Sequence, residues 1–163
     1  MKLNKFIKYI YFLIFVSSII FFNTKIALGA VGQSLSQMTQ EIGTPTSVKL
    51  AYAVSPQHLA SYQKIGVNAY LFKVNSFKIT AVFNSSGICY KEFTYNNRSL
   101  PDPSLLIGST LASEKPKVLM VIPLRFEKYQ YGSGSNAVIY ETSGEPGNLS
   151  AKAYSPSLAP SSN

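Results

Sequence analysis

The sequence predicts a small α+β domain in which an antiparallel sheet carries two short helices packed on one face. Short runs rich in Val, Ile, Thr, Tyr and Phe, separated by Asn, Ser and Gly, are typical of strands and tight turns. Amphipathic stretches at 34–42 and 104–113 each precede a set of such runs. The order helix, strands, helix, strands suggests a duplicated helix-plus-meander unit, with halves at 32–98 and 101–154 of a single 30–154 domain.

The first 29 residues differ from the rest and have the three zones of a secretory signal peptide. Lys2, Lys5 and Lys8 precede an apolar run at 9–22, and small residues follow at 27–30. This run of 14 residues is shorter than the roughly 20 that a membrane span needs. We therefore predict that residues 1–29 are cleaved as a signal peptide and that the protein is exported, to the periplasm or as a secreted protein. The alternative is an uncleaved N-terminal anchor, which is the only membrane contact we expect.

The charge balance argues against nucleic acid as a partner. The chain carries 15 Lys and Arg against 7 Asp and Glu, a net charge of +8. Four of the basic residues and none of the acidic ones lie in the predicted signal peptide, so the mature chain keeps a net charge of +4. Its basic residues are scattered and form no stripe of the kind that binds a phosphate backbone.

The best-defined helix is predicted over 34–42. Ser34 is suited to the N-cap, and Gln37 stands three residues later, as in a capping box. Gly43 fits the position just after the helix. Three apolar residues at helical spacing form the stripe that would face the sheet: Leu35, Met38 and Ile42.

The rest of the first half is predicted as a strand, a short helix and a three-strand meander. The strand covers 46–54, and the helix begins at Ser55-Pro56 and ends near Gly66. The meander strands are 69–74, 77–83 and 88–95. Alternation in the middle strand predicts one buried face packed against the helices, made of Phe77, Ile79, Ala81 and Phe83.

The second half begins after a Pro- and Asn-containing linker at 96–103. Asp102 is suited to cap the helix at 104–113, which Gly108 weakens. Residues 155–163 are rich in Ser and Pro and predict a disordered tail. Four further strands are predicted at 118–122, 126–131, 136–141 and 149–154.

The first half has the pattern of a known type of envelope module. Gly32, a short amphipathic helix, Gly43-x-Pro45 and strands ending in a hairpin resemble the small outer-membrane-assembly lipoproteins. The doubled arrangement is similar to that of beta-lactamase inhibitor proteins. This resemblance, over about residues 32–154, implies two helices on one face of an antiparallel sheet in an exported protein.

Few residues are suited to catalysis or to holding a metal. The only histidine is His58, in a context typical of a helix surface, and Cys89 is the only cysteine, in an apolar stretch typical of a buried thiol. We therefore predict no catalytic residue, no metal and no cofactor. The alternative is a small carbohydrate-binding or hydrolytic protein using Glu and Tyr side chains, for which Glu92 and Glu127 on predicted strands are candidates.

Aromatic side chains in the C-terminal strands favour a protein-binding function. Tyr and Arg are enriched where proteins contact one another. Tyr129 and Tyr131 are two residues apart and share one face of their strand, with Arg125 near its start. We therefore predict a non-catalytic, exported module that binds another envelope or secreted protein through Arg125, Tyr129 and Tyr131. In the alternative interpretation, these tyrosines pack the sheet.

Overall fold

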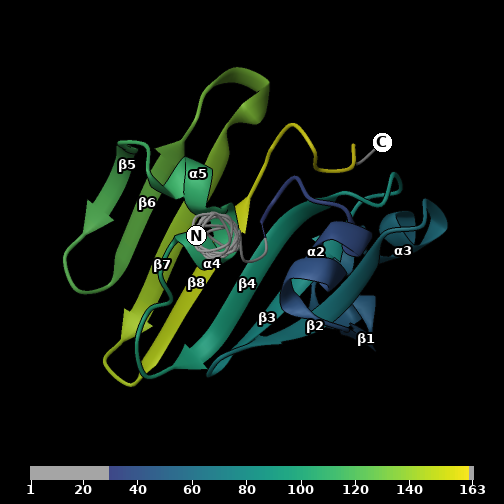
Figure 1. Ribbon diagram of the computed structural model, residues 1–163, viewed down its shortest axis with the longest axis horizontal. Helices are drawn as coiled ribbons and strands as arrows, with labels where there is room; N and C mark the ends of the chain where they lie inside the picture. The colour runs from purple at the N-terminus through teal and green to yellow at the C-terminus, as the bar shows by residue number, and fades with distance from the viewer. Residues whose placement is uncertain (1–29, 162–163) are drawn as a thin grey trace, which may run out of the picture.

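The computed structural model describes residues 30–161; the predicted signal peptide and the last two residues, 162 and 163, lie outside this range. The chain forms one eight-stranded sheet in which every neighbouring pair is antiparallel. The strand order is β1-β2-β3-β4-β8-β7-β6-β5 (Figure 1). The strands are β1 (Thr46–Val48), β2 (Asn68–Val74), β3 (Phe77–Phe83), β4 (Cys89–Asn97), β5 (Lys117–Ile122), β6 (Phe126–Tyr131), β7 (Val138–Glu145) and β8 (Asn148–Tyr154).

The strand order divides the sheet into two meanders of four strands. Strands β1 to β4 pair in sequence order, and so do β5 to β8. The two meanders join through their last strands, where β4 pairs with β8 from Lys91 opposite Tyr154 to Asn97 opposite Leu149. The predicted α+β class with an antiparallel sheet is therefore confirmed.

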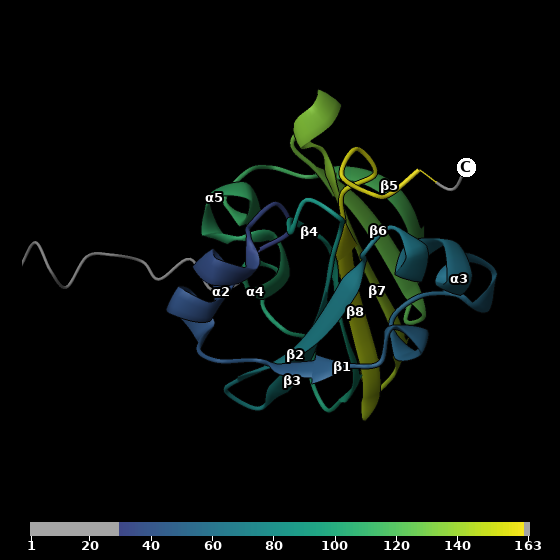
Figure 2. The ribbon, with the colours of Figure 1, turned by 90° about the vertical axis from the view of Figure 1, so that its right-hand side faces the viewer.

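Three helices lie on one side of the sheet, called here the helix side: α2 (Leu35–Ile42), α4 (Ser104–Ile107) and α5 (Ser109–Ala112) (Figure 2). The predicted capping box of α2 is present, with Ser34 and Gln37 each bonding the other's backbone. The predicted second helix is split into α4 and α5 by Gly108, whose φ of 80° a side-chain-bearing residue rarely adopts. Asp102 accepts a hydrogen bond from the Ser104 amide at 2.8 Å, but the N-cap of α4 is Pro103, one residue after the predicted cap.

The middle strand of the first half packs as its alternation predicts. Ile79, Ala81 and Phe83 are buried on the helix side, and Phe77 is partly buried on the same side. Phe83 and Ala81 share a cluster with Met38 of α2. Cys89 belongs to the same cluster and is fully buried, as its apolar context predicts.

A further helix, α3 (Pro56–Lys64), covers the other side of the first meander, as Figure 2 shows. The predicted strand at 46–54 is wrong beyond Val48: it is replaced by a 3-10 helix, η1 (Leu50–Tyr52). Leu50 and Ala53, three residues apart, are both buried in one cluster with Tyr62 of α3. Because these side chains are buried, the chain leaves the edge of the sheet after Val48 and passes over the side that α3 covers.

The C-terminal segment differs from the predicted disordered tail. Residues 155–161 lie against the first meander, where Leu158 packs beside the cluster around Tyr62. The Leu158 carbonyl accepts a hydrogen bond from Asn84 Nδ2 at 3.0 Å, and the Pro160 carbonyl accepts one from the Tyr62 hydroxyl at 3.5 Å. The apolar side chain of Leu158 thus packs this Ser- and Pro-rich segment against the first meander.

Within residues 30–161, no helix has the length and apolar character needed to cross a membrane.

Candidate functional site

The two sides of the sheet are covered to different extents in the two meanders. In the first meander, η1 and α3 are inserted between β1 and β2 and cover the side opposite α2. In the second meander, β5 and β6 are joined by a turn at 123–125, with no inserted helix. Among residues 30–161, no helix therefore covers this side of β6, β7 and β8 or the adjoining end of β4, and this surface is called here the open face. It includes the side chains of Tyr95, Phe126, Lys128, Glu141, Lys152 and Tyr154.

Strand register brings the charged side chains of the open face together. Glu141 of β7 lies directly opposite Lys128 of β6 and Lys152 of β8. Directly opposite residues in an antiparallel sheet share a face and have Cβ atoms about 5 Å apart. Three neighbouring strands thus place one carboxylate between two ammonium groups.

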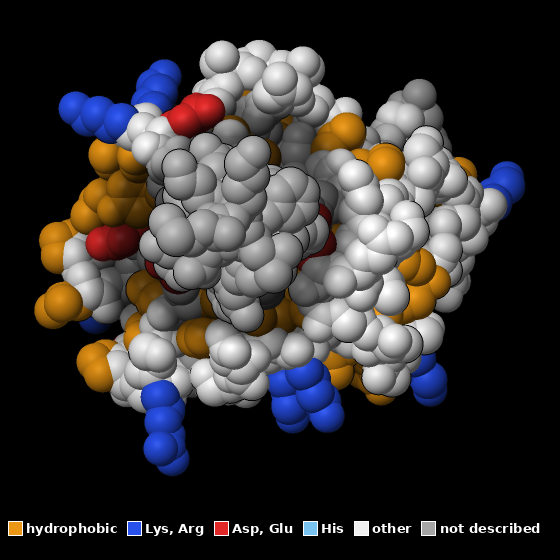
Figure 3. Space-filling model, viewed as in Figure 1, with side chains coloured by type: hydrophobic (Ala, Val, Ile, Leu, Met, Phe, Trp, Pro, Cys, Tyr) orange, Lys and Arg blue, Asp and Glu red, His pale blue; other side chains and the backbone are white. Residues whose placement is uncertain are grey.

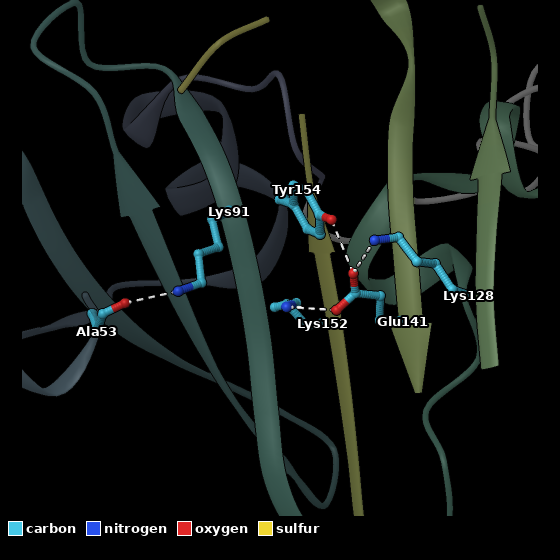
Figure 4. Close-up of polar contacts among 6 residues, drawn as sticks. All are labelled: Ala53, Lys91, Lys128, Glu141, Lys152 and Tyr154. Carbon is cyan, nitrogen blue, oxygen red and sulfur yellow. Dashed lines mark hydrogen bonds and ion pairs between the residues drawn. The ribbon is translucent and has the colours of Figure 1, made fainter. Parts of the chain in front are cut away.

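Glu141 is the centre of this polar network (Figure 4). Its Oε1 accepts a hydrogen bond from the Tyr154 hydroxyl at 2.9 Å and lies 3.0 Å from Lys128 Nζ, while its Oε2 lies 2.5 Å from Lys152 Nζ. Burial by itself raises the pKa of Glu141, but the hydrogen bonds from Lys152, Lys128 and Tyr154 outweigh it and lower the pKa. The lowered pKa favours the ionised form of Glu141, which forms ion pairs with two lysines and is unsuited to donate a proton.

Lys91 of β4 lies at the boundary between the covered half and the open face. Its Nζ donates to the Ala53 carbonyl at 2.9 Å, as Figure 4 shows, and lies 5.0 Å from the ring centroid of Phe93. Burial, and to a smaller extent the charge of Lys152, lower the pKa of Lys91. Three lysines against one glutamate leave the open face and its boundary with an excess of positive charge.

A hollow lies between the aromatic side chains of the open face. Its volume is about 110 Å³. Tyr95 of β4 is 57% exposed on one side of it, and Phe126 of β6 contributes from the other. The remaining lining residues are Glu141, Ser143, Ser150, Ala151 and Lys152.

The residues predicted to bind a partner are not brought together on one exposed surface. Tyr131 is 7% exposed and belongs to the core on the helix side, where its ring meets Tyr140 edge-on at 6.4 Å. Tyr129 shares that side, as strand alternation predicts, and is partly buried, with its hydroxyl donating to Glu127 at 3.1 Å. The placement of Tyr131 in the core corrects its inclusion in a binding surface and matches the alternative interpretation.

Arg125 is exposed in the β5–β6 turn and lines a cavity of about 240 Å³. The cavity is formed by residues of the linker before α4, of the β5–β6 and β7–β8 turns, and of the adjoining ends of β6, β7 and β8. They include Leu100, Leu124, Pro146 and Leu149. Glu127 also lines it, so Arg125 and Glu127 are the charged groups of an otherwise apolar hollow.

The two carboxylates considered for hydrolysis lie far apart. Glu92 is on β4 and Glu127 on β6, with β8 and β7 between them. Three strand spacings correspond to about 14 Å, whereas paired catalytic carboxyls are about 5–9.5 Å apart. The sheet therefore does not form this pair.

Glu92 is fully buried on the helix side of β4. Its Oε1 is 3.6 Å from Cys89 Sγ, and its Oε2 has no hydrogen-bond partner among residues 30–161. Burial raises the pKa of Glu92 well above its ordinary value, although the contact with Cys89 acts in the opposite direction. Burial inside the core thus disfavours the ionised form of this carboxyl.

No local pattern along the chain indicates the network around Glu141. Its members come from β6, β7 and β8, and they meet only because of the register of these strands. The open face also requires that β5 and β6 are joined by a turn with no inserted helix. The short interval between the strands at 118–122 and 126–131 was the one available sign of that absence.

Among residues 30–161, no three His, Cys, Asp or Glu side chains are grouped so that they could hold a metal ion. Comparisons of the chain with protein-family models, with curated proteins and with solved structures give no match.

Proposed function

We propose that this protein is an exported, non-catalytic module of the cell envelope or secreted fraction that binds another protein through its open face. The observation that carries the proposal is the open face itself, where an exposed tyrosine of β4 lies beside lysines of the second meander. The partner surface that fits it has an apolar group for the hollow beside Tyr95 and acidic groups for the surrounding lysines.

The chemistry of the open face supports a protein partner. Tyrosine supplies a large contact area with few rotatable bonds, and interface residues that dominate binding are enriched in it. Tyr95 is available for such contact because more than half of its surface is exposed. Favourable binding surfaces are also ordered before the partner arrives. Here Glu141 fixes Lys128 and Lys152 in place through its two oxygens.

The position of the N-terminal end of the described chain also supports this surface. Ala30 forms a β-bridge with Ile107 of α4 on the helix side, and Ser34 forms another with Ile88. The segment preceding Ala30 therefore joins the domain on the side opposite the open face. Whether residues 1–29 are cleaved or kept as an anchor, the open face is directed away from their point of attachment.

Paired tyrosine variants test the proposal. Tyr95→Ala removes the exposed ring of the open face, and Tyr52→Ala removes a ring that is 76% exposed on η1. Because both rings are largely solvated, both variants should keep the wild-type circular dichroism spectrum. In affinity capture from the envelope and secreted fractions, Tyr95→Ala should lose the partner and Tyr52→Ala should keep it. Equal capture by Tyr95→Ala and wild type would exclude Tyr95 from the binding surface.

A second candidate, carbohydrate binding without hydrolysis, is favoured by one observation. The hollow between Tyr95 and Phe126 also presents a carboxylate, an ammonium group and two serines, which suit sugar hydroxyls. A glycan array separates the two functions. Saturable binding of one glycan that is abolished in Tyr95→Ala would support the second candidate in place of the first.

A further inference from the structure

The edge strand β5 has an unusual surface. All six of its residues are exposed, and five consecutive ones, Val118 to Ile122, are apolar. Within residues 30–161 it pairs only with β6, so the backbone groups along its other side have no strand partner in the described part of the chain. Figure 3 shows hydrophobic side chains gathered along this margin of the molecule, where Figure 1 places β5.

The opposite edge of the sheet is protected in the usual way. Strand β1 has only three residues, Thr46 to Val48, two of them polar. Native proteins commonly shorten edge strands or place charges on them, because an exposed apolar edge pairs with other chains. Strand β5 lacks any charge between Val118 and Ile122. Its apolar character is thus a specific feature of one edge.

A β-bulge gives β5 an internal symmetry. The pairing with β6 shifts register between Val118 and Met120, so that Leu119 is the additional residue. As a result, Val118 and Val121 oppose Tyr129 and Glu127 and share the helix side. Lys117 and Ile122 oppose Gln130 and Phe126 and share the other side. Each pair is placed symmetrically about the Leu119–Met120 centre of the strand.

We propose that β5 pairs antiparallel with β5 of a second copy of this chain, about a two-fold axis that passes between Leu119 and Met120. In this register Val118 of each copy lies opposite Val121 of the other, and Lys117 lies opposite Ile122. Val118 and Val121 are three residues apart and would point to opposite sides of a regular strand. The bulge places both on the helix side, and residues that lie opposite one another in a sheet must share a side. The two sheets then continue into one another, with both helix sides on the same side.

The residues flanking β5 favour a second copy in this orientation. Pro116 and Pro123 stop the strand at both ends, at symmetric distances from its centre. Just beyond them, the two-fold brings Glu114 of one copy to the end of the strand where Arg125 of the other lies, so opposite charges meet. A parallel pairing would instead place Lys117 beside Lys117, which like-charge repulsion disfavours. In the antiparallel arrangement Lys115 lies opposite Leu124 and Lys117 opposite Ile122, so no lysine of this segment lies directly opposite another basic residue. The charges therefore favour the antiparallel dimer over the parallel one.

Sedimentation velocity over a dilution series tests this dimer. The chain is expressed from its full coding sequence with a C-terminal tag, and its processed mass is recorded. Wild type should be a dimer that dissociates on dilution. Val118→Lys/Val121→Lys places lysines opposite one another at two sites, so dimerisation should weaken by about tenfold or more. Val118→Lys/Val121→Glu places Lys opposite Glu at both sites and should restore the dimer.

Matched controls make each result decisive. Thr46→Lys on the other edge should leave the dimer unchanged, and circular dichroism should show every variant folded, since Val118 and Val121 are 59% and 49% exposed. A wild type that is monomeric at all concentrations, or that forms larger assemblies, would overturn the proposal. So would a stable dimer of the double-lysine variant. A folded Lys/Glu variant that remains monomeric would exclude the antiparallel register.

Discussion

Replacing the buried carboxyl of Glu92 by an amide should change how the stability of the fold depends on pH. Glu92→Gln keeps the shape of the side chain and removes the proton that titrates. In the folded protein this carboxyl is fully buried, its Oε2 has no partner and burial raises its pKa. In the unfolded chain it titrates near its ordinary pKa of 4.5. The folded state therefore holds a proton that the unfolded state releases as the pH rises above 4.5.

The sign and size of the effect follow from proton linkage. A carboxyl with a raised pKa in the folded state contributes its full stability below the unfolded pKa and loses it as the pH rises towards the folded pKa. One proton changes the free energy of unfolding by at most about 1.4 kcal/mol per pH unit. Between pH 5 and pH 8, wild type should therefore lose stability through Glu92, by no more than about 1.4 kcal/mol for each pH unit.

Urea unfolding at pH 5 and pH 8, followed by circular dichroism, measures this loss. The Glu92→Gln variant should lose less stability over the interval than wild type, because it lacks the titrating group. Glu145→Gln, at an exposed position on β7, is the control and should follow wild type. Other groups that titrate in the interval are common to all three proteins. Parallel pH profiles for wild type and Glu92→Gln would refute the assignment of a neutral, buried Glu92.

Two further predictions concern the core on the helix side. Ile79→Ala removes a fully buried side chain and should lower the free energy of unfolding by about 2–5 kcal/mol in urea titrations, whereas an unchanged midpoint would place Ile79 outside the core. Tyr131→Ala removes a ring packed against Tyr140 and should cost about 3–5 kcal/mol, so that its melting temperature falls clearly below that of wild type. A Tyr131→Ala variant of unchanged stability would return this residue to the set of candidate binding residues.

Local sequence patterns were sufficient for most of the secondary structure. The capping box of Ser34 and Gln37 and the alternation from Phe77 to Phe83 depend on neighbours along the chain, and both are present in the fold. The strand predicted beyond Val48 failed because Leu50 and Ala53 are buried in a cluster that also holds Val82 of β3 and Phe93 of β4, which lie far away along the chain. The alternation of apolar and polar residues in this segment fits a strand as well as the observed 3-10 helix, so it does not decide between them.

The candidate site depended on information that a single sequence does not hold. Alternation placed Tyr129 and Tyr131 on one face, but it does not say which face the helices cover. The pairing of β4 with β8 and the register of β6, β7 and β8 decide which side chains meet on the open face. Tyr95 and Glu141 therefore became candidates only once the topology was known.

Site-directed photo-cross-linking from the open face tests the central claim most directly. A photoreactive phenylalanine analogue replaces Tyr95 on the open face in one variant and Thr110, exposed on α5 of the helix side, in another. Irradiation in the source cells, followed by mass spectrometry, identifies what each position touches. We predict one specific protein adduct from position 95 and none from position 110. A specific adduct from position 110, with none from position 95, would contradict binding through the open face.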